Sequence, residues 1–117
     1  MHDCLLGLYE KSMPNALGLE QKLATAAEFG FDFLEISIDE SEEKLARLRW
    51  NAAQRHALAD AAYRTGTPIK TMCLSGHRKY PIGSADAPTL QRGMQIMREA
   101  IDLAADLGIR IIQLAGY

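Results

Sequence analysis

The apolar pattern of this 117-residue chain changes period repeatedly between that of a strand and that of a helix. Four short apolar runs, at 4–9, 31–37, 69–75 and 109–117, alternate with segments whose apolar residues recur at helical spacing. Alternation of strands and helices is typical of a parallel sheet with right-handed crossover connections. The sequence therefore predicts an α/β fold with four parallel strands.

Termination and capping signals define the helices between these strands. Three main helices are expected, each followed by a glycine suited to a helix C-terminus: 19–29, 51–65 and 88–107. Asn51 and Gln54 have the N-cap and N3 spacing of a capping box at the second of them. Asp39 and Glu42 have the same spacing after the second strand, which predicts a short extra helix over about 41–48.

An internal repeat favours a barrel over an open, doubly wound sheet. AAEFGFDFLEI (26–36) and AADLGIRIIQL (104–114) share a helix end, a glycine and a strand, and Glu35 matches Gln113. A complete (β/α)₈ barrel needs ~250 residues, so four strands in this length are half of one. Ending on an apolar edge strand is unusual for a finished domain. We expect residues 1–117 to be a partial barrel, truncated after strand four.

Composition excludes several classes of function. The 13 Lys and Arg against 15 Asp and Glu give a net charge of -2, which argues against a nucleic-acid-binding surface. No apolar stretch approaches the ~20 residues of a membrane span. Cys4 and Cys73 lie in apolar runs without metal-ligand spacing, as reduced thiols of a cytosolic protein do. With no signal-peptide pattern at the N-terminus, a cytoplasmic location is expected.

In such barrels the active site is built at the carboxyl ends of the strands. Strand alternation places Phe33, Glu35 and Ser37 on the lumen side of the second strand. A carboxylate on a buried strand needs a partner or a ligand, so Glu35 is the best single candidate. The alternative is a structural ion pair with a Lys or Arg of a neighbouring strand.

The ends of the first and third strands supply further candidates for binding an anionic sugar phosphate. Ser75 ends the third strand and is followed by His77 and Arg78. The imidazole can donate or accept a proton, and the guanidinium can form two hydrogen bonds to oxygen atoms at once. A solvated basic loop is the alternative there. Tyr9, at the end of the first strand, either lines the ligand pocket or fills the barrel.

No metal site can be assembled from these residues. A catalytic metal usually needs about three protein ligands, and only Glu35 and His77 are plausible ones. Phosphate-binding glycine motifs and the nucleophile-elbow motif GxSxG are also absent from the sequence. No catalytic residue can therefore be named in this chain.

Four segments together resemble the N-terminal half of the L-xylulose 5-phosphate (L-ribulose 5-phosphate) 3-epimerases, also known as hexulose-6-phosphate isomerases, of the xylose-isomerase-like barrel superfamily. They are GLYEKSMP, EFGFDFLEISIDESEEKLARLRW, MCLSGHRKYPIGS and LGIRIIQLAGY. The resemblance covers nearly the whole chain, and SIDES…LxRLxW, CLSGHRxxPxGS and IQLAGY are its most specific stretches.

This resemblance implies a carbohydrate isomerase that inverts C3 of a ketopentose phosphate, a step of ascorbate degradation, by proton transfer through an enediolate assisted by a divalent metal. The family's metal ligands, a Glu, Asp, His and Glu set, come from later strands than those present here, so none can be carried over. The positions that match are those lining the pocket: Tyr9, Glu35, Ser75, His77 and Arg78. The resemblance thus implies substrate-binding residues in a fragment that is inactive by itself.

Two other functions remain open. One is a non-catalytic half-barrel that binds a completing C-terminal half or a second copy of itself, which would bury both open sheet edges. The other keeps the barrel with different chemistry, that of a hydroxypyruvate isomerase or an apurinic-site endonuclease. The net charge of -2 disfavours the endonuclease.

Overall fold

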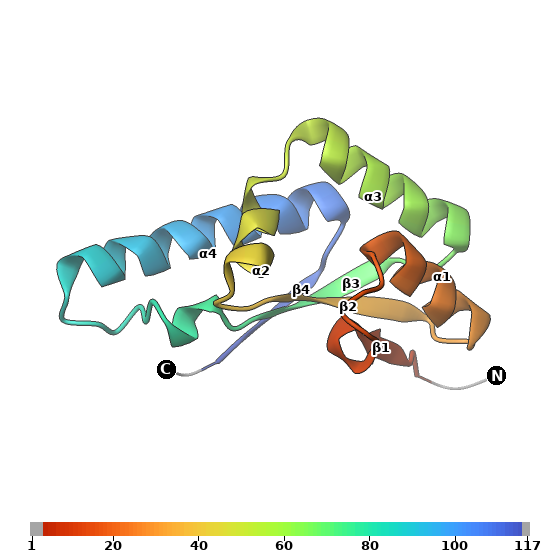
Figure 1. The fold of residues 1–117 in the computed structure, drawn as a ribbon, viewed down its shortest axis with the longest axis horizontal. Coiled ribbons are helices and arrows are strands. Elements are labelled where there is room, and N and C mark those ends of the chain that lie inside the picture. Colours follow the sequence, from red (N-terminus) through yellow and green to blue (C-terminus); the bar gives the residue numbers. More distant parts are fainter. Residues whose placement is uncertain (1–3, 116–117) are drawn as a thin grey trace.

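The computed structural model describes residues 4–115, which form a four-stranded parallel sheet (Figure 1). The strands are β1 (Gly7–Tyr9), β2 (Phe33–Ile38), β3 (Ile69–Leu74) and β4 (Ile111–Leu114), paired in the order β1-β2-β3-β4. Each strand thus pairs with the next in sequence, without the order reversal of a doubly wound sheet. The predicted α/β fold is confirmed, with first and last strands shorter than expected; Gly116 and Tyr117 lie outside the described residues.

All four α-helices lie on one face of the sheet, as one wall of a barrel requires (Figure 1). The helical elements are η1 (Glu10–Ser12), α1 (Leu19–Glu28), α2 (Glu42–Ala46), η2 (Arg47–Arg49), α3 (Ala52–Thr65), η3 (Gly76–Arg78) and α4 (Ala87–Leu107). Gly66 and Gly108 follow α3 and α4 with φ of 72° and 75°, the left-handed conformation that glycine adopts without strain. The three main helices are therefore confirmed.

The two predicted capping boxes have different outcomes. Asn51 accepts the N–H of Gln54 (2.8 Å) and the Gln54 side chain accepts the N–H of Asn51 (2.9 Å), so the box at α3 is confirmed. The box at α2 is wrong. Ser41 is the N-cap there and accepts the N–H of Lys44 (3.2 Å). Asp39 instead accepts from the backbone and hydroxyl of Ser41, so the N-cap lies two residues later than predicted.

Strand alternation divides the sheet as the sequence predicted. Leu34, Ile36 and Ile38 of β2 are fully buried beneath the helices. On the opposite face Phe33 and Glu35 remain partly exposed, because none of the α-helices within residues 4–115 covers that side. The uncovered face corresponds to the lumen of a closed barrel.

A buried arginine fixes η2 against the helices around it. Arg55 of α3 donates from Nε to the carbonyl oxygen of Trp50 (2.9 Å) and from Nη2 to that of Leu48 (3.0 Å). Its Nη1 donates to Asp106 of α4 (2.9 Å). These bonds join α3, α4 and η2, and η2 carries a residue of the candidate site.

Within residues 4–115, none of the helices is both long and apolar enough to cross a membrane.

Candidate functional site

A small cavity of about 190 Å³ opens at the carboxyl ends of the strands. Its walls come from the ends of β1, β3 and β4 and from the residues that follow them: Tyr9, Lys11, Cys73, Leu74, Ser75, Arg78, Gln113, Leu114 and Ala115. In a (β/α) barrel this is the end at which ligands bind. A larger apolar hollow lies at the opposite ends of the strands, where an active site is not expected in this fold.

The structure brings three of the five predicted binding residues together in this cavity. Tyr9, Ser75 and Arg78 line it, whereas Glu35 and His77 are not among its lining residues. Lys11 and Gln113 complete its polar wall. The cavity thus offers hydroxyl, amide and cationic groups, a set suited to a polyhydroxylated anion.

Glu35 lies one step deeper on the lumen face. Its Oε2 accepts a hydrogen bond from the hydroxyl of Thr71 on the neighbouring strand (2.7 Å), at the position paired with it in the sheet. Among the described residues no Lys or Arg forms an ion pair with Glu35. The carboxylate is held by a neutral partner and keeps an acceptor oxygen for a further donor.

His77 is buried on the helix side of the site. Only 4% of the residue is exposed, and its Nε2 donates to the carbonyl oxygen of Gly93 in α4 (2.9 Å). The imidazole thus ties η3 to α4. Arg78, the next residue, is exposed at the cavity rim and donates to Glu40 (3.3 Å).

The second rim cation, Lys11, is paired with Asp39 at 2.6 Å. Burial raises the pKa of Asp39, but its hydrogen bonds with Lys11 and Ser41 outweigh this and lower the pKa to about 2. The hydrogen bond with Asp39 raises the pKa of Lys11. The loop after β2 therefore supplies one carboxylate to each rim cation, Asp39 to Lys11 and Glu40 to Arg78.

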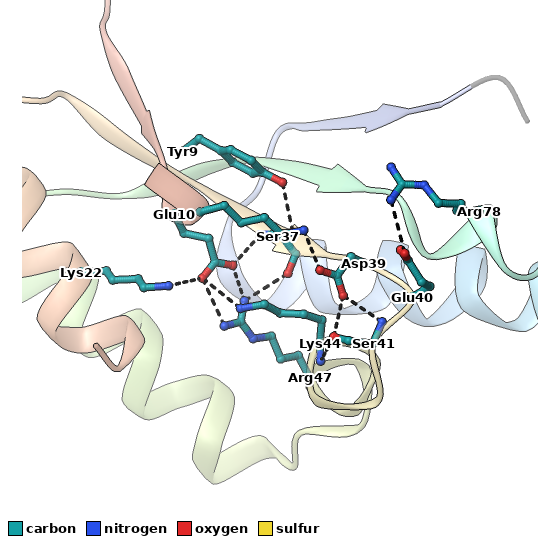
Figure 2. A network of polar contacts seen from close by, with 11 residues as sticks. Tyr9, Glu10, Lys22, Ser37, Asp39, Glu40, Ser41, Lys44, Arg47 and Arg78 are labelled. Atoms are coloured by element: carbon teal, nitrogen blue, oxygen red, sulfur yellow. Dashed lines mark hydrogen bonds and ion pairs between the residues drawn. The ribbon is translucent and has the colours of Figure 1, made fainter. Parts of the chain in front are cut away.

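Tyr9 places a neutral hydroxyl at the cavity. Burial raises the pKa of its phenol above the usual value, so the hydroxyl is protonated at neutral pH. The hydroxyl donates to Oγ of Ser37 at the end of β2 (3.2 Å), which fixes the ring over the lumen face (Figure 2).

Sequence reasoning missed the buried ionic cluster beside the cavity, which surrounds Glu10 (Figure 2). The Glu10 side chain is fully buried and forms ion pairs with Lys22 of α1 (3.1 Å), Lys44 of α2 (3.6 Å) and Arg47 of η2. Burial raises the pKa of Glu10, but hydrogen bonds and charge from Arg47 outweigh it and hold the pKa below its usual value. One carboxylate thus compensates three buried cations.

No group of three His, Cys, Asp or Glu side chains within residues 4–115 is arranged to hold a metal ion. Tyr9, Lys11, Ser75 and the other cavity residues include no carboxylate or imidazole. The donor set present does not fit a catalytic divalent metal.

Sequence comparison agrees with this architecture. The model of the xylose isomerase-like TIM barrel family matches residues 23–117, and the chain belongs to that family.

Curated relatives share about half of its sequence. The chain is 50% identical over 112 residues to the L-ribulose-5-phosphate 3-epimerase UlaE of Salmonella heidelberg (strain SL476), a match covering 96% of this chain and 39% of that protein. The UlaE of Escherichia coli O139:H28 is 49% identical over the same shares. These matches confirm the resemblance predicted from the sequence motifs. The chain spans about two fifths of the length of these curated relatives.

Solved structures show the same fold. A D-psicose 3-epimerase superposes with a TM-score of 0.77 at 17% identity, covering 93% of this chain and 36% of that one. The E. coli 3-keto-D-glucoside 4-epimerase YcjR superposes with a TM-score of 0.65 at 21% identity, covering 92% and 36%. At such identities the likeness shows the fold alone.

Proposed function

We propose that the chain provides the N-terminal, substrate-binding part of a cytoplasmic sugar-phosphate 3-epimerase of the L-ribulose 5-phosphate type. The observation that carries the proposal is the cavity at the carboxyl ends of the strands, with a neutral phenol and two cations in its wall. The 50% identity to L-ribulose-5-phosphate 3-epimerase UlaE supports the same substrate class.

Different residues of the cavity suit different parts of the substrate. Lys11 and Arg78 at the rim suit the phosphate, because guanidinium and ammonium groups form charge-assisted bonds to its oxygens. Tyr9 and Ser75 suit the hydroxyl groups of the sugar chain. Glu35, one step deeper, is available to a hydroxyl that reaches past the cavity, whereas His77 supports η3 from behind.

Inversion at C3 needs one group to remove a proton and another to return it on the opposite face. The described residues that line the cavity include no carboxylate or imidazole for this task. The divalent metal implied by the resemblance also finds no ligand set among residues 4–115. We therefore assign this chain to binding and orienting the substrate, and we expect it to be inactive by itself.

A non-catalytic half-barrel that pairs with another chain is the second candidate. The exposed apolar side chains of β4 favour it, since Ile111 is 61% and Leu114 is 52% exposed on a strand with one pairing partner in the described sheet. Turnover by a completed barrel would favour the enzyme, and its absence would favour the pairing module.

Binding of L-ribulose 5-phosphate to the 117-residue chain tests the substrate assignment. In titrations followed by ¹H–¹⁵N correlation spectra of the ¹⁵N-labelled chain, we expect the phosphorylated sugar to bind more tightly than L-ribulose. It should also shift the amide signals of Ser75 and Arg78. Arg78→Gln should weaken the affinity about tenfold, because it removes one charge-assisted contact worth ~1.4 kcal/mol.

Arg64→Gln is the matched control, because Arg64 is an exposed arginine on α3 that pairs with Asp60 away from the cavity. It should leave the affinity unchanged. Equal losses in both variants, or shifts confined to residues outside the cavity, would contradict the proposed binding site.

A further inference from the structure

The backbone of Ser37 lies where the sheet loses its first strand. β1 pairs with β2 as far as Tyr9 opposite Glu35, and the chain then turns into η1. The N–H of Ser37, beyond the last pair, donates to Oε1 of Glu10 at 2.6 Å. A side-chain carboxylate therefore takes the place of the strand acceptor that β1 no longer provides.

The same cluster holds the other backbone group of this residue. Nη1 of Arg47 donates to the carbonyl oxygen of Ser37 (3.1 Å) and also to Glu10. The side chains of Glu10 and Arg47 are at least nine-tenths buried. Both polar backbone atoms of Ser37 are thus bonded to one buried ion pair (Figure 2).

The third bond of Ser37 points toward the cavity, because its Oγ accepts the hydroxyl of Tyr9. We propose that Glu10 is a positioning residue, which holds the Tyr9 hydroxyl at the wall of the cavity by fixing its acceptor Ser37. The role of that hydroxyl in binding substrate rests on the proposed function. The coupling itself is a property of the unliganded chain.

The charge of Glu10 is what makes this positioning strong. Oε1 of the carboxylate accepts the Ser37 N–H in a charge-assisted bond, and Arg47 joins the same oxygen to the carbonyl group of Ser37. Lys22 and Lys44 lie against the other oxygen, Oε2. Glutamine has the same size but only one acceptor oxygen, and its NH₂ group would face those cations. Glu10→Gln should therefore release Ser37 without changing the volume of the core.

Nuclear magnetic resonance of the chain, labelled with ¹⁵N and with ¹³C at the tyrosine ζ-carbons, tests the coupling. In Glu10→Gln we expect the Ser37 amide proton to move upfield and the Tyr9 ζ-carbon to move to its position in Ser37→Ala, which lacks the hydroxyl acceptor. Lys22→Met is the matched control, because Lys22 is a buried member of the cluster that donates to Oε2 of Glu10, whereas the Ser37 N–H is bonded to Oε1. It should leave both signals in place.

If Glu10→Gln does not fold, the double variant Glu10→Gln/Lys22→Met removes one charge of each sign and is compared with Lys22→Met alone. The same displacement of the Tyr9 signal is expected. A Tyr9 signal that stays in place without Glu10, or one that moves equally in Lys22→Met, would overturn the proposal. Because no ligand is added, failure here is distinct from failure to bind L-ribulose 5-phosphate.

Discussion

Replacement of Glu10 by glutamine is expected to lower the free energy of unfolding by about 3–5 kcal/mol. Among residues 4–115, Glu10 is the one carboxylate that pairs with Lys22, Lys44 and Arg47, and its side chain is fully buried. Removing its charge leaves three cations in a region of low dielectric without the group that offsets their desolvation. Urea unfolding of both proteins, followed by circular dichroism at neutral pH, measures the difference.

The control is an ion pair of the same kind on the surface. Asp60 and Arg64 pair at 2.8 Å on α3 with side chains 51% and 60% exposed, so Asp60→Asn should cost no more than about 1 kcal/mol. If Glu10→Gln is no more destabilising than Asp60→Asn, the cluster does not hold the fold together as described.

Replacement of Gly93 by alanine is expected to destabilise the chain by about 1–3 kcal/mol. Alanine inside a helix is normally better than glycine by roughly 0.5–1 kcal/mol. At Gly93, however, a Cβ atom would lie 2.5 Å from the backbone oxygen of Tyr80, where α4 passes closely behind the loop after β3. The clash is with backbone, so the loop or the helix has to move.

The same movement should disturb the site from behind, since His77 donates to the carbonyl oxygen of Gly93. Gln95→Ala, an exposed position two residues along α4, is the control and should leave stability within about 0.5 kcal/mol. Urea unfolding compares the two variants. A Gly93→Ala protein as stable as the parent would show that α4 and the loop are not packed this closely.

The fold could be predicted from sequence because its signals are local. Alternation in β2 separated Leu34, Ile36 and Ile38 from the lumen face, and Asn51 with Gln54 marked the start of α3. The capping box predicted at Asp39 is wrong because its carboxylate accepts from Ser41 and also pairs with Lys11, a residue 28 positions away. Such a long-range contact leaves no trace in local spacing.

The candidate site was predictable only in part, from the positions of side chains at and just after the ends of the strands. Tyr9, Ser75 and Arg78 meet at the cavity because the strand ends meet there. His77 is close in sequence but turns toward α4. A signal for the ionic cluster was present in the sequence, since Lys22 lies at a core-facing position of α1, three residues after Leu19.

We propose that residues 1–117 supply the substrate-binding part of a 3-epimerase and that the proton-transferring groups lie outside them. The most direct measurement is an assay, in the presence of Mn²⁺, of interconversion between L-ribulose 5-phosphate and L-xylulose 5-phosphate. It compares the 117 residues alone with the same residues joined to the part of UlaE that they do not match. We predict turnover by the joined protein and none by the chain alone. Turnover by the chain alone, or a folded joined protein without activity, would contradict the account.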